Sequence, residues 1–559
     1  MQRMRGGKLL LVPLLAALIV AAGCGSDKKK TTASPTTEQG TVAKGGTLVL
    51  GAEQNGDCAD WLGACAGASW NIYMIQQHTV PRAFNVKPDG EYEPSVLLDG
   101  EPTFESTPKQ KVTYKIRADA VWSDGQPITS SDFKYVWDQA KNGTDIYDKT
   151  GYKDIESVDD SNPKVAVVTY STPYADWKDL FGGNYGVWPS HLLLGKDRDA
   201  ETKDGYTWSG GPWKLDHWTK DVEVKLVRND KYWGKKPNLD AVVFKVISDT
   251  AAEIQAYKTG QVDGIYPQVQ LELATLKNQP NTSFSTTPGF SYEAIWFNTS
   301  KPPLNSQAVR QALAYATDRK AIVDRLFGPI SKDIQPLQSF TTPRNKTYYT
   351  KSFSQYVKDL SKVNSLMTGD GWAKGSDGIW AKGGQKASLT VRVTAGNKRR
   401  ELTEQILQSQ WKDAGFELTT DNQSSSILFG QSLPNGDFQV ALFAQVPTSK
   451  SPAQCVNFCT ESIPTDANKS GTNYYRISDP ELDRIWKQVD QVSAESQRAG
   501  LVKQGADRLG ELVPAIPLDP FPNTVVYNTA KLGGNIIDNP SVLGMFWNLN
   551  EWYCKGGKC

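Results

Sequence analysis

Few residues of this chain have the types and spacing that catalysis requires. The three histidines, His78, His191 and His217, are far apart in sequence, so side chains that titrate near neutral pH are scarce. The sequence has no G-x-S-x-G nucleophile elbow, no G-x-x-x-x-G-K-S/T phosphate loop and no H-E-x-x-H metal motif. Asp159 and Asp160 are adjacent acids of the kind that glycoside chemistry uses, but such acids in a polar loop are usually only solvated. We therefore expect a protein that is not an enzyme and that uses no cofactor and no metal.

Six of the seven cysteines occur as three close pairs. In an exported chain this arrangement predicts local disulfides, although six cysteines formally allow other pairings. A metal site is the poorer interpretation, because the sequence has no Cys-x-x-Cys pair and no histidine near the cysteines. The expected disulfides join Cys58 to Cys65, Cys455 to Cys459, and Cys554 to Cys559.

The first 44 residues indicate export and anchoring. A basic start precedes the apolar run Leu9–Val20, which is too short to span a bilayer and is typical of a secretory signal peptide. The small residues before Cys24 resemble the lipobox of bacterial lipoproteins, which implies a signal peptide over 1–23 and a lipid on Cys24. The alternative is an ordinary secreted protein that loses Cys24 with the peptide. Residues 24–44 are rich in Ser, Thr, Lys and Gly, and we expect a lipidated, disordered tether there.

Charge and size favour a soluble body with a small partner. The chain has 62 basic and 61 acidic residues and a net charge of +1, which argues against nucleic acid as a partner. The part beyond residue 24 is long enough for two or three packed lobes, and none of it is apolar enough to cross a membrane. Most of its many aromatic residues are expected in the core, and a minority could line a cleft.

Apolar periodicity predicts alternating strands and helices. A strand, a helix and a second strand follow one another from 389 onward, which favours an α/β layer. One helix is expected after Ser130 or Ser131 as its cap, a second is expected to stop at Gly260, and a third runs to Gly328. Further strands are predicted at 45–54, 111–117, 209–218, 222–249 and near 291.

Six segments in order resemble the family 5 extracellular solute-binding proteins, which are the peptide, dipeptide and nickel receptors of ATP-binding-cassette (ABC) importers. The densest match is WSDGQPITSSDFKYVW at 122–137. The other five are GGPWKL, RNDKYWGKKPNLDAVVFKVISD with GQVDGI, FNTSKPPLNSQAVRQALAYATDRKAIV, GTNYYRISDPELDRIW and VPAIPL. Together they cover nearly the whole chain from about residue 45.

The resemblance implies a two-lobed, periplasmic-binding-protein-like α/β fold of type II, in the large cluster with an extra subdomain, with a hinged cleft. Lobe I is expected from 45–75, 205–295 and 515–559, the extra subdomain from 76–204, and lobe II from 296–514. The resemblance also implies a monomer outside the cell membrane, held there by its lipid, that captures a small solute and delivers it to an ABC permease. Closure of the lobes around the ligand would give the permease one shape to recognise.

The resemblance suggests residues for the cleft. The strand SYEAIWFN crosses between the lobes, so Tyr292 and Trp296 are expected to face the ligand. In oligopeptide receptors of this family, an aspartate after the Phe-Asp-hydrophobic strand binds the ligand's amino group, but the matching segment 437–462 has no acid between its first residue and Glu461. The anchor could have moved to Glu53 or Asp57. The full set of expected ligand-binding residues is Gln54, Asp57, Trp61, Tyr292, Trp296, Phe443 and Gln445.

The ligand class stays open at this point. Peptide is the first choice, because it is the commonest ligand of the family, and blocked or amide-rich peptides would suit Gln54, Asn55 and Gln445. Oligosaccharide is the runner-up and would suit the faces of Trp61 and Trp296. Nickel is disfavoured by the scarcity of imidazole. A structural or adhesive surface lipoprotein is the third class considered.

Overall fold

The computed structural model describes residues 42–559 apart from 57, 67, 68, 184, 448 and 468. The predicted signal peptide, Cys24 and nearly all of the predicted tether lie outside the described residues, as does Asp57.

A ten-stranded mixed sheet runs through the chain from residue 43 onward, with the order β17-β16-β18-β12-β19-β11-β1-β10-β9-β8. The strands are β1 (Thr47–Ala52), β8 (Trp213–Thr219), β9 (Glu223–Arg228), β10 (Ala241–Val246), β11 (Gly264–Ile265), β12 (Thr282–Phe297), β16 (Ser388–Arg392), β17 (Glu417–Thr420), β18 (Val440–Gln445) and β19 (Ala515–Asn528).

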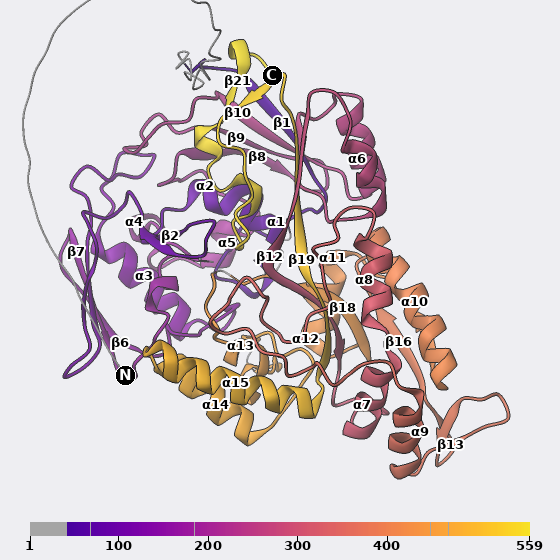
Figure 1. The fold of residues 1–559 in the computed structure, drawn as a ribbon. Helices are drawn as coiled ribbons and strands as arrows, with labels where there is room; N and C mark the ends of the chain where they lie inside the picture. The colour runs from indigo at the N-terminus through magenta and orange to yellow at the C-terminus, as the bar shows by residue number, and fades with distance from the viewer. Residues whose placement is uncertain (1–41, 57, 67–68, 184, 448, 468) are drawn as a thin grey trace, which may run out of the picture. The chain divides into compact units, whose positions relative to one another are not determined.

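Strands β12 and β19 are the longest and belong to both halves of this sheet. They pair antiparallel from Thr282 opposite Asn528 to Trp296 opposite Ala515, with a register shift after Pro288 and another after Glu293. β11 pairs with the C-terminal part of β19, whereas β18 pairs with the second half of β12. Figure 1 shows the two strands side by side in the middle of the fold.

The first half of the sheet joins parallel and antiparallel pairs. β1 lies parallel to β10, and β8, β9 and β10 form an antiparallel meander. Helix α6 (Thr250–Lys258) follows β10, and the side chain of Asp249 caps its first turn by accepting a hydrogen bond from the N–H of Ala252. The chain leaves the helix through Gly260, whose φ of +75° is readily adopted only by glycine, so the predicted stop is confirmed.

The second half contains the predicted strand, helix, strand unit. β16 and β17 are parallel, and α10 (Lys398–Ala414) connects them. The single helix predicted up to Gly328 is instead two, α7 (Gln307–Ala316) and α8 (Arg319–Phe327). The break occurs because Asp318 accepts a hydrogen bond from the N–H of Ala321 and begins a new helix as its cap. Helices α9 (Leu360–Gly369), α14 (Pro480–Gln491) and α15 (Glu495–Leu512) belong to the same part of the chain.

Residues 76–204 contain a separate four-stranded sheet with the order β4-β5-β7-β6. Helix α3 (Ser130–Asn142) packs on it. The helix cap is Thr129 rather than Ser130 or Ser131, because Thr129 and Asp132 form a reciprocal capping box. The strands are β4 (Thr103–Glu105), β5 (Lys111–Lys115), β6 (Ile155–Asn162) and β7 (Val165–Tyr170).

The remaining elements are short. The helices are α1 (Ser69–Asn71), α2 (Gln77–Thr79), α4 (Ser190–Leu193), α5 (Arg198–Thr202), α11 (Ser425–Ile427), α12 (Leu433–Asn435) and α13 (Cys455–Phe458). The strands are β2 (Phe84–Val86), β3 (Tyr92–Pro94), β13 (Ala373–Lys374), β14 (Trp380–Lys382), β15 (Gln385–Lys386), β20 (Leu532–Gly533) and β21 (Tyr553–Cys554).

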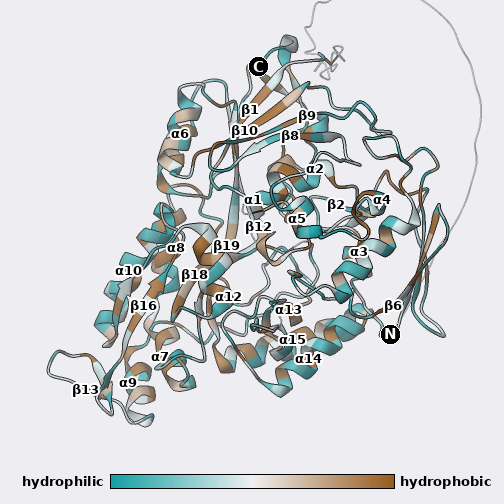
Figure 2. Cartoon of the chain, turned by 180° about the vertical axis from the view of Figure 1, so that it is seen from behind, coloured by the Kyte–Doolittle hydropathy of each residue, from teal (hydrophilic) through white to brown (hydrophobic). Residues whose placement is uncertain are grey.

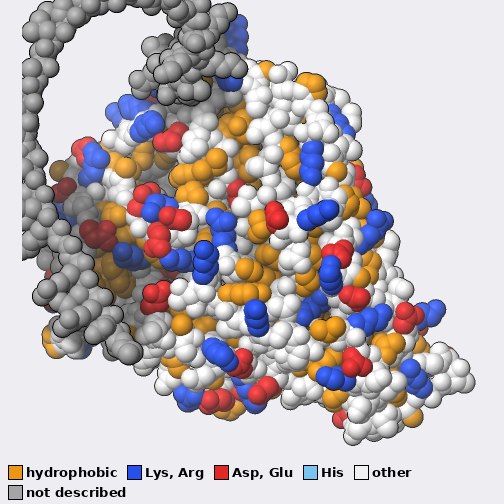
Figure 3. Space-filling view, in the orientation of Figure 1, with side chains coloured by type: hydrophobic (Ala, Val, Ile, Leu, Met, Phe, Trp, Pro, Cys, Tyr) orange, Lys and Arg blue, Asp and Glu red, His pale blue; other side chains and the backbone are white. Residues whose placement is uncertain are grey.

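Buried apolar side chains form two large clusters, one around β1, β10 and the segment 70–215, the other around β12, β18 and helices α7 to α10. Figure 2 shows the sheet strands β1, β10 and β16 largely brown, whereas α3 and α10 mix brown with teal. The buried residues of each helix recur at helical spacing, so each helix buries one face, and that of α10 includes the charged residues Arg399, Arg400 and Glu404. On the face seen in Figure 3, acidic and basic side chains are interspersed, in keeping with the balanced charge of the sequence.

The six described cysteines are joined as Cys58–Cys65, Cys455–Cys459 and Cys554–Cys559. These are the three local pairs expected from their spacing. Each bridge closes a short loop, so its contribution to stability through the unfolded state is at the small end of the usual range.

Candidate ligand-binding site

A first cavity lies where several strand ends meet. Its empty space is about 1350 Å³, part of which is open to solvent. β1, β11 and β18 all end at this cavity, and the central strands β12 and β19 pass beside it. Its lining includes Glu53 and Gln54 after β1, Tyr266, Pro267 and Gln268 after β11, Phe443, Ala444 and Gln445 at the end of β18, Ser291 of β12, Phe521, Pro522 and Asn523 of β19, and Arg400 of α10.

A second cavity adjoins the first. Its empty space is about 1200 Å³, and the two cavities share Tyr147, Gln445, Val446 and Thr472 as lining residues. The second cavity also has lining residues from the segment that carries the four-stranded sheet, from β12 and from two loops of the second half. They are Asp148, Thr150, Tyr152, Tyr174, Asp179, Leu180, Gly183, Tyr185, Phe290, Tyr292, Phe340, Thr341, Thr342, Asn345, Pro447, Ser449, Lys450, Ser451, Ala453, Gln454, Val456 and Asn457. Because they share four lining residues, we treat the two cavities as compartments of one cleft.

The lining of the first cavity combines aromatic rings with amides. This combination is typical of sites that bind organic ligands, in which rings supply contact area and a few polar groups fix orientation. The rings belong to Trp61, Trp70, Tyr73, Tyr147, Tyr266, Phe429, Phe443, Tyr474 and Phe521, and the amides to Gln54, Gln268, Gln445 and Asn523.

The acid of the first cavity, Glu53, is buried and hydrogen-bonded to the backbone. Glu53 is 7% exposed, and its Oε2 accepts a hydrogen bond of 2.8 Å from the backbone N–H of Gln268. Burial raises the pKa of Glu53, and burial together with the charge of Glu53 raises the pKa of Glu253 well above its usual value. Close to these acids, the Tyr266 hydroxyl and the Asn523 amide donate to Asp538, and burial raises the pKa of that carboxyl to about 6. Burial therefore disfavours the charged form of each of these three carboxyls.

The cationic residue of the first cavity, Arg400, is hydrogen-bonded to other protein side chains. Arg400 Nε donates to Glu293 Oε1 at 2.9 Å, and Arg400 Nη1 donates to the hydroxyl of Thr394 at 3.2 Å. Glu293 also accepts from Arg399, and both arginines and Glu293 are almost fully buried. Arg400 thus lines the cavity while it shares the single carboxylate of Glu293 with Arg399.

Four expected ligand-binding residues line the first cavity together, namely Gln54, Trp61, Phe443 and Gln445. Tyr292 lines the second cavity, which Gln445 also borders. The sequence did not single out Trp70, Tyr147, Tyr266, Arg400 or Asn523, although all five contribute to the first cavity.

Trp296 lies in the core, and the expectation that it faces the ligand is corrected. It is 0% exposed and lines neither cavity. Its ring stacks on Tyr475 and Phe443 with centroid distances of 4.5 and 5.1 Å, and its Nε1 donates to the carbonyl of Phe443 at 2.9 Å. Trp296 shares a strand face with Tyr292, but it lies four residues further along β12, where this aromatic cluster covers the face.

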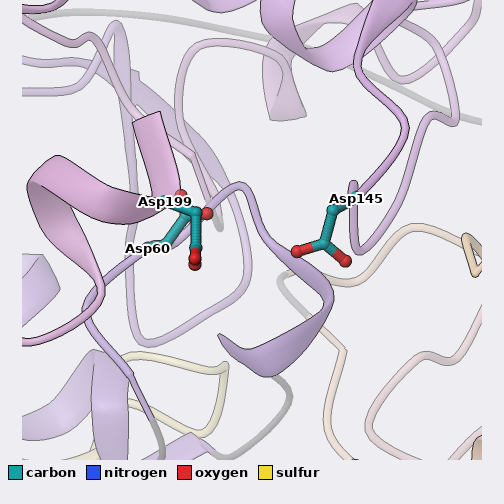
Figure 4. Close-up of side chains that lie close together, drawn as sticks. All are labelled: Asp60, Asp145 and Asp199. Carbon is teal, nitrogen blue, oxygen red and sulfur yellow. The ribbon is translucent and has the colours of Figure 1, made fainter. Parts of the chain in front are cut away.

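A group of three acids that line neither cavity has the composition of a metal site, but its buried member is already paired with an arginine. Asp60, Asp145 and Asp199 bring carboxylate oxygens within 4.8 Å of one another (Figure 4). Arg198 donates to both oxygens of the buried Asp60 at 2.7 to 2.9 Å and also to the Asp145 carbonyl at 2.9 Å. A guanidinium therefore already pairs with the buried member of this group.

Among the described residues, the structure has no helix with the length and apolarity that crossing a membrane requires.

Residues 92–462 match the model of a protein family described as bacterial extracellular solute-binding proteins, family 5. Among curated proteins, the chain is similar to the oligopeptide-binding protein OppA of Mycobacterium tuberculosis, with 24% identity over 92% of this chain and 89% of that protein. It is also similar to the oligopeptide-binding protein AppA of Bacillus subtilis, with 25% identity over 99% of both chains.

Solved structures share the fold. The AppA structure from Bacillus subtilis in complex with a nonapeptide superposes with a TM-score of 0.82 at 22% identity, covering 92% of this chain and 99% of that one. A periplasmic EDTA-binding protein, EppA, gives a TM-score of 0.80 at 24% identity, covering 92% and 97%. The two-lobed α/β fold predicted from the sequence is confirmed by these likenesses.

Proposed function

This chain belongs to family 5 of the bacterial extracellular solute-binding proteins, and from that premise we propose that it captures peptides in the cleft and delivers them to an ABC import permease. The observation that carries the proposal is the pair of adjoining cavities, which offers space for more than one residue of an extended ligand. The curated relatives named oligopeptide-binding proteins support the same ligand class.

The chemistry of the first cavity suits a peptide backbone. Side-chain amides both donate and accept hydrogen bonds, and Gln54, Gln268 and Gln445 can therefore pair with peptide N–H and C=O groups. The surrounding rings provide apolar contact for side chains of varied shape. A receptor with this lining would bind through the backbone and tolerate many sequences.

An oligosaccharide is the second candidate, because Trp61 and Trp70 in the first cavity offer ring faces on which sugars stack. This candidate keeps the receptor role and changes only the cargo.

Native mass spectrometry of the protein purified from its source, followed by denaturing release of the bound molecules, distinguishes the two. We expect released species whose fragment masses differ by amino-acid residues. Fragments that differ by hexose units would reject peptide as the cargo and support the second candidate.

We propose that Cys24 carries a lipid that holds the protein at the outer face of the cell membrane. The basic start, the apolar run and the small residues before Cys24 support this. Replacing Cys24 by serine should move the protein from the membrane fraction to the soluble fraction without changing its affinity for ligand. Detergent-free fractionation with immunoblotting measures this, and a Cys24→Ser protein that stays in the membrane fraction would refute the anchor.

We also propose that β12 and β19 are the hinge of a monomeric receptor. In this proposal lobe I consists of 45–75, 205–295 and 515–559, the extra subdomain of 76–204, and lobe II of 296–514. The pairing of both strands with neighbours from each half of the sheet supports this division. Small-angle scattering should show a more compact protein with ligand bound, and an unchanged radius of gyration on saturation would argue against it.

A further inference from the structure

We propose that a third cavity, lined by hydroxyl and amide side chains, binds uncharged hydrogen-bonding groups near one end of the ligand. These groups are the carboxamide or hydroxyl side chains of a peptide, or the hydroxyls of a sugar. This inference rests on the proposed function, because it assigns part of the same ligand to the third compartment. It adds a preference for polar over apolar groups and names the residues that cause it.

The third cavity adjoins the first cavity but not the second. Its empty space is about 1120 Å³, part of which is open to solvent. It shares Glu53, Gln54 and Gln268 with the first cavity, whereas no described residue lines both the second and the third. The first cavity therefore lies between the other two, and an extended ligand that crosses the first can enter both.

Uncharged polar side chains from both halves of the large sheet line the third cavity. The first half contributes Gln54 and Asn55 after β1, and Ser248 and Thr250 where α6 begins. The second half contributes Thr394 and Asn397 between β16 and α10, and the three serines 424–426 after β17. The described lining contains no aromatic ring and no large aliphatic side chain. This compartment therefore offers hydrogen bonds where the first cavity offers ring faces.

The hydrogen bonds among the described residues leave part of this polar lining available to a ligand. The hydroxyl of Thr394 accepts from Arg400 Nη1 at 3.2 Å, and its own O–H remains as a donor. Asn397 Nδ2 donates to Gln268 Oε1, and the second N–H of that amide remains. The side chain of Gln54 is half-buried at the border with the first cavity. A ligand hydroxyl or carboxamide both donates and accepts, so it can pair with such groups without carrying a charge.

The few charged side chains of the lining do not favour an ionised ligand group. Lys220 and Asp221 are both exposed, and Lys220 Nζ already pairs with Asp204 at 3.2 Å. Solvent screens charges in such exposed positions. Glu53 is buried, and burial raises the pKa of its carboxyl. The main attraction that the described lining offers is therefore its uncharged hydrogen-bonding groups.

An apolar group would bind less well in this compartment. It would displace water from amides and hydroxyls without replacing the hydrogen bonds of that water, which costs free energy for each group left unpaired. A carboxamide or hydroxyl of similar shape would replace them. Asparagine resembles leucine in shape, and threonine resembles valine, so exchanging one for the other in a ligand changes polarity at nearly constant shape.

The test uses calorimetric titration of the full chain with four nonapeptides that share free termini and a core of Ala and Tyr. Each end carries either Asn-Thr or Leu-Val, so the polar pair stands at the amino end, the carboxyl end, both ends or neither. We expect a polar pair at one particular end to strengthen binding at least about tenfold over the peptide with none. That end identifies the orientation of the ligand.

A fifth peptide separates the two sources of the polar groups. It carries a hexose on the threonine of the preferred end. Tighter binding than its unmodified parent identifies sugar hydroxyls as the groups that the compartment takes, and equal or weaker binding identifies peptide side chains.

The variants assign the preference to the third cavity. Ser248→Val and Ser425→Val should each reduce the affinity ratio between the polar-ended and apolar-ended peptides about threefold, and together about tenfold, because each replaces a hydroxyl of the lining by an apolar group. Ser248 is exposed and Ser425 is half-buried, so both variants should fold, and urea unfolding checks this. The matched control is Ser361→Val, an exposed serine of α9 that lines none of the three cavities and should leave the ratio unchanged.

Equal binding of the four peptides, or a ratio that the double variant does not change, would overturn the third compartment and leave peptide capture intact. Failure of the wild type to bind any of the peptides would instead reject peptide as the ligand. The compartment is then judged by titration with the neutral trisaccharide maltotriose. Binding that the double variant weakens about tenfold supports the compartment, and absent or unchanged binding refutes it.

Discussion

Replacing Glu293 by glutamine is expected to lower the free energy of unfolding by about 3–5 kcal/mol. Glu293 is 0% exposed on β12, and both Arg399 and Arg400 donate to its carboxylate. Burial raises the pKa of Glu293, but the two guanidinium charges outweigh burial, and the net pKa is lowered. The carboxylate is therefore ionised at neutral pH. Without the charge of Glu293, two buried guanidinium groups lose their main partner. Leaving a buried charge unpaired costs more free energy than the intact ion pair contributes to stability.

Asp519 should reduce the loss of stability in the Glu293→Gln variant. It lies directly opposite Glu293 on β19, with Oδ2 4.0 Å from Arg399 Nη1, and burial raises its pKa to about 8. In the Glu293→Gln variant the arginines lose their nearer anion, so Asp519 should ionise more readily and replace part of the lost charge. We therefore expect Glu293→Gln together with Asp519→Asn to be less stable than Glu293→Gln alone.

Urea unfolding followed by tryptophan fluorescence measures these changes. The matched control is Glu481→Gln, which removes an exposed carboxylate paired with Arg484 on α14 and should leave the unfolding midpoint unchanged. A Glu293→Gln midpoint equal to that of Glu481→Gln would show that the buried cluster does not hold α10 to the central strands.

Replacing Trp296 by alanine is expected to lower the free energy of unfolding by about 3–5 kcal/mol and to leave ligand affinity within about threefold. The indole fills the centre of a ring cluster that includes Phe340, Phe443 and Tyr475, so its loss leaves a cavity in the core. Because Trp296 lines neither cavity of the cleft, it offers no surface to a ligand.

The matched comparison is Trp70→Ala, because Trp70 lines the first cavity and is also a buried indole. It should weaken binding about fivefold or more, since buried tryptophans in a contact surface commonly supply more than about 1 kcal/mol. Urea unfolding and calorimetry on both variants separate the two roles. A Trp296→Ala protein of normal stability that binds its ligand poorly would contradict the core assignment and indicate that Trp296 contacts the ligand.

Apolar periodicity and helix-ending residues in the sequence correctly predicted several individual strands and helices. The strand, helix, strand unit from β16 to β17 follows from periodicity, and the end of α6 follows from Gly260. The break between α7 and α8 was missed, because apolar residues continue across it on one face. Asp318 was the available signal, since an aspartate that precedes a helical period is a typical cap.

The cleft was predicted only in part, because its walls come from segments far apart in sequence. Alternation along β12 identified the strand face that Tyr292 and Trp296 share. It did not show that Tyr292 lies at the cavity whereas Trp296 is covered by other aromatic rings. Tyr266 follows a short strand, and the rule that ligands bind beyond the carboxyl ends of strands could have found it. Asp148 and Thr342, which line the second cavity, lie in irregular segments, where the sequence carries no period that could place them.

Calorimetric titration of the wild-type protein with a pool of pentapeptides of mixed sequence tests the central claim most directly. The account predicts saturable binding at about one peptide per chain. Absence of heat with the peptide pool, together with saturable binding of a neutral oligosaccharide, would contradict peptide capture by this cleft.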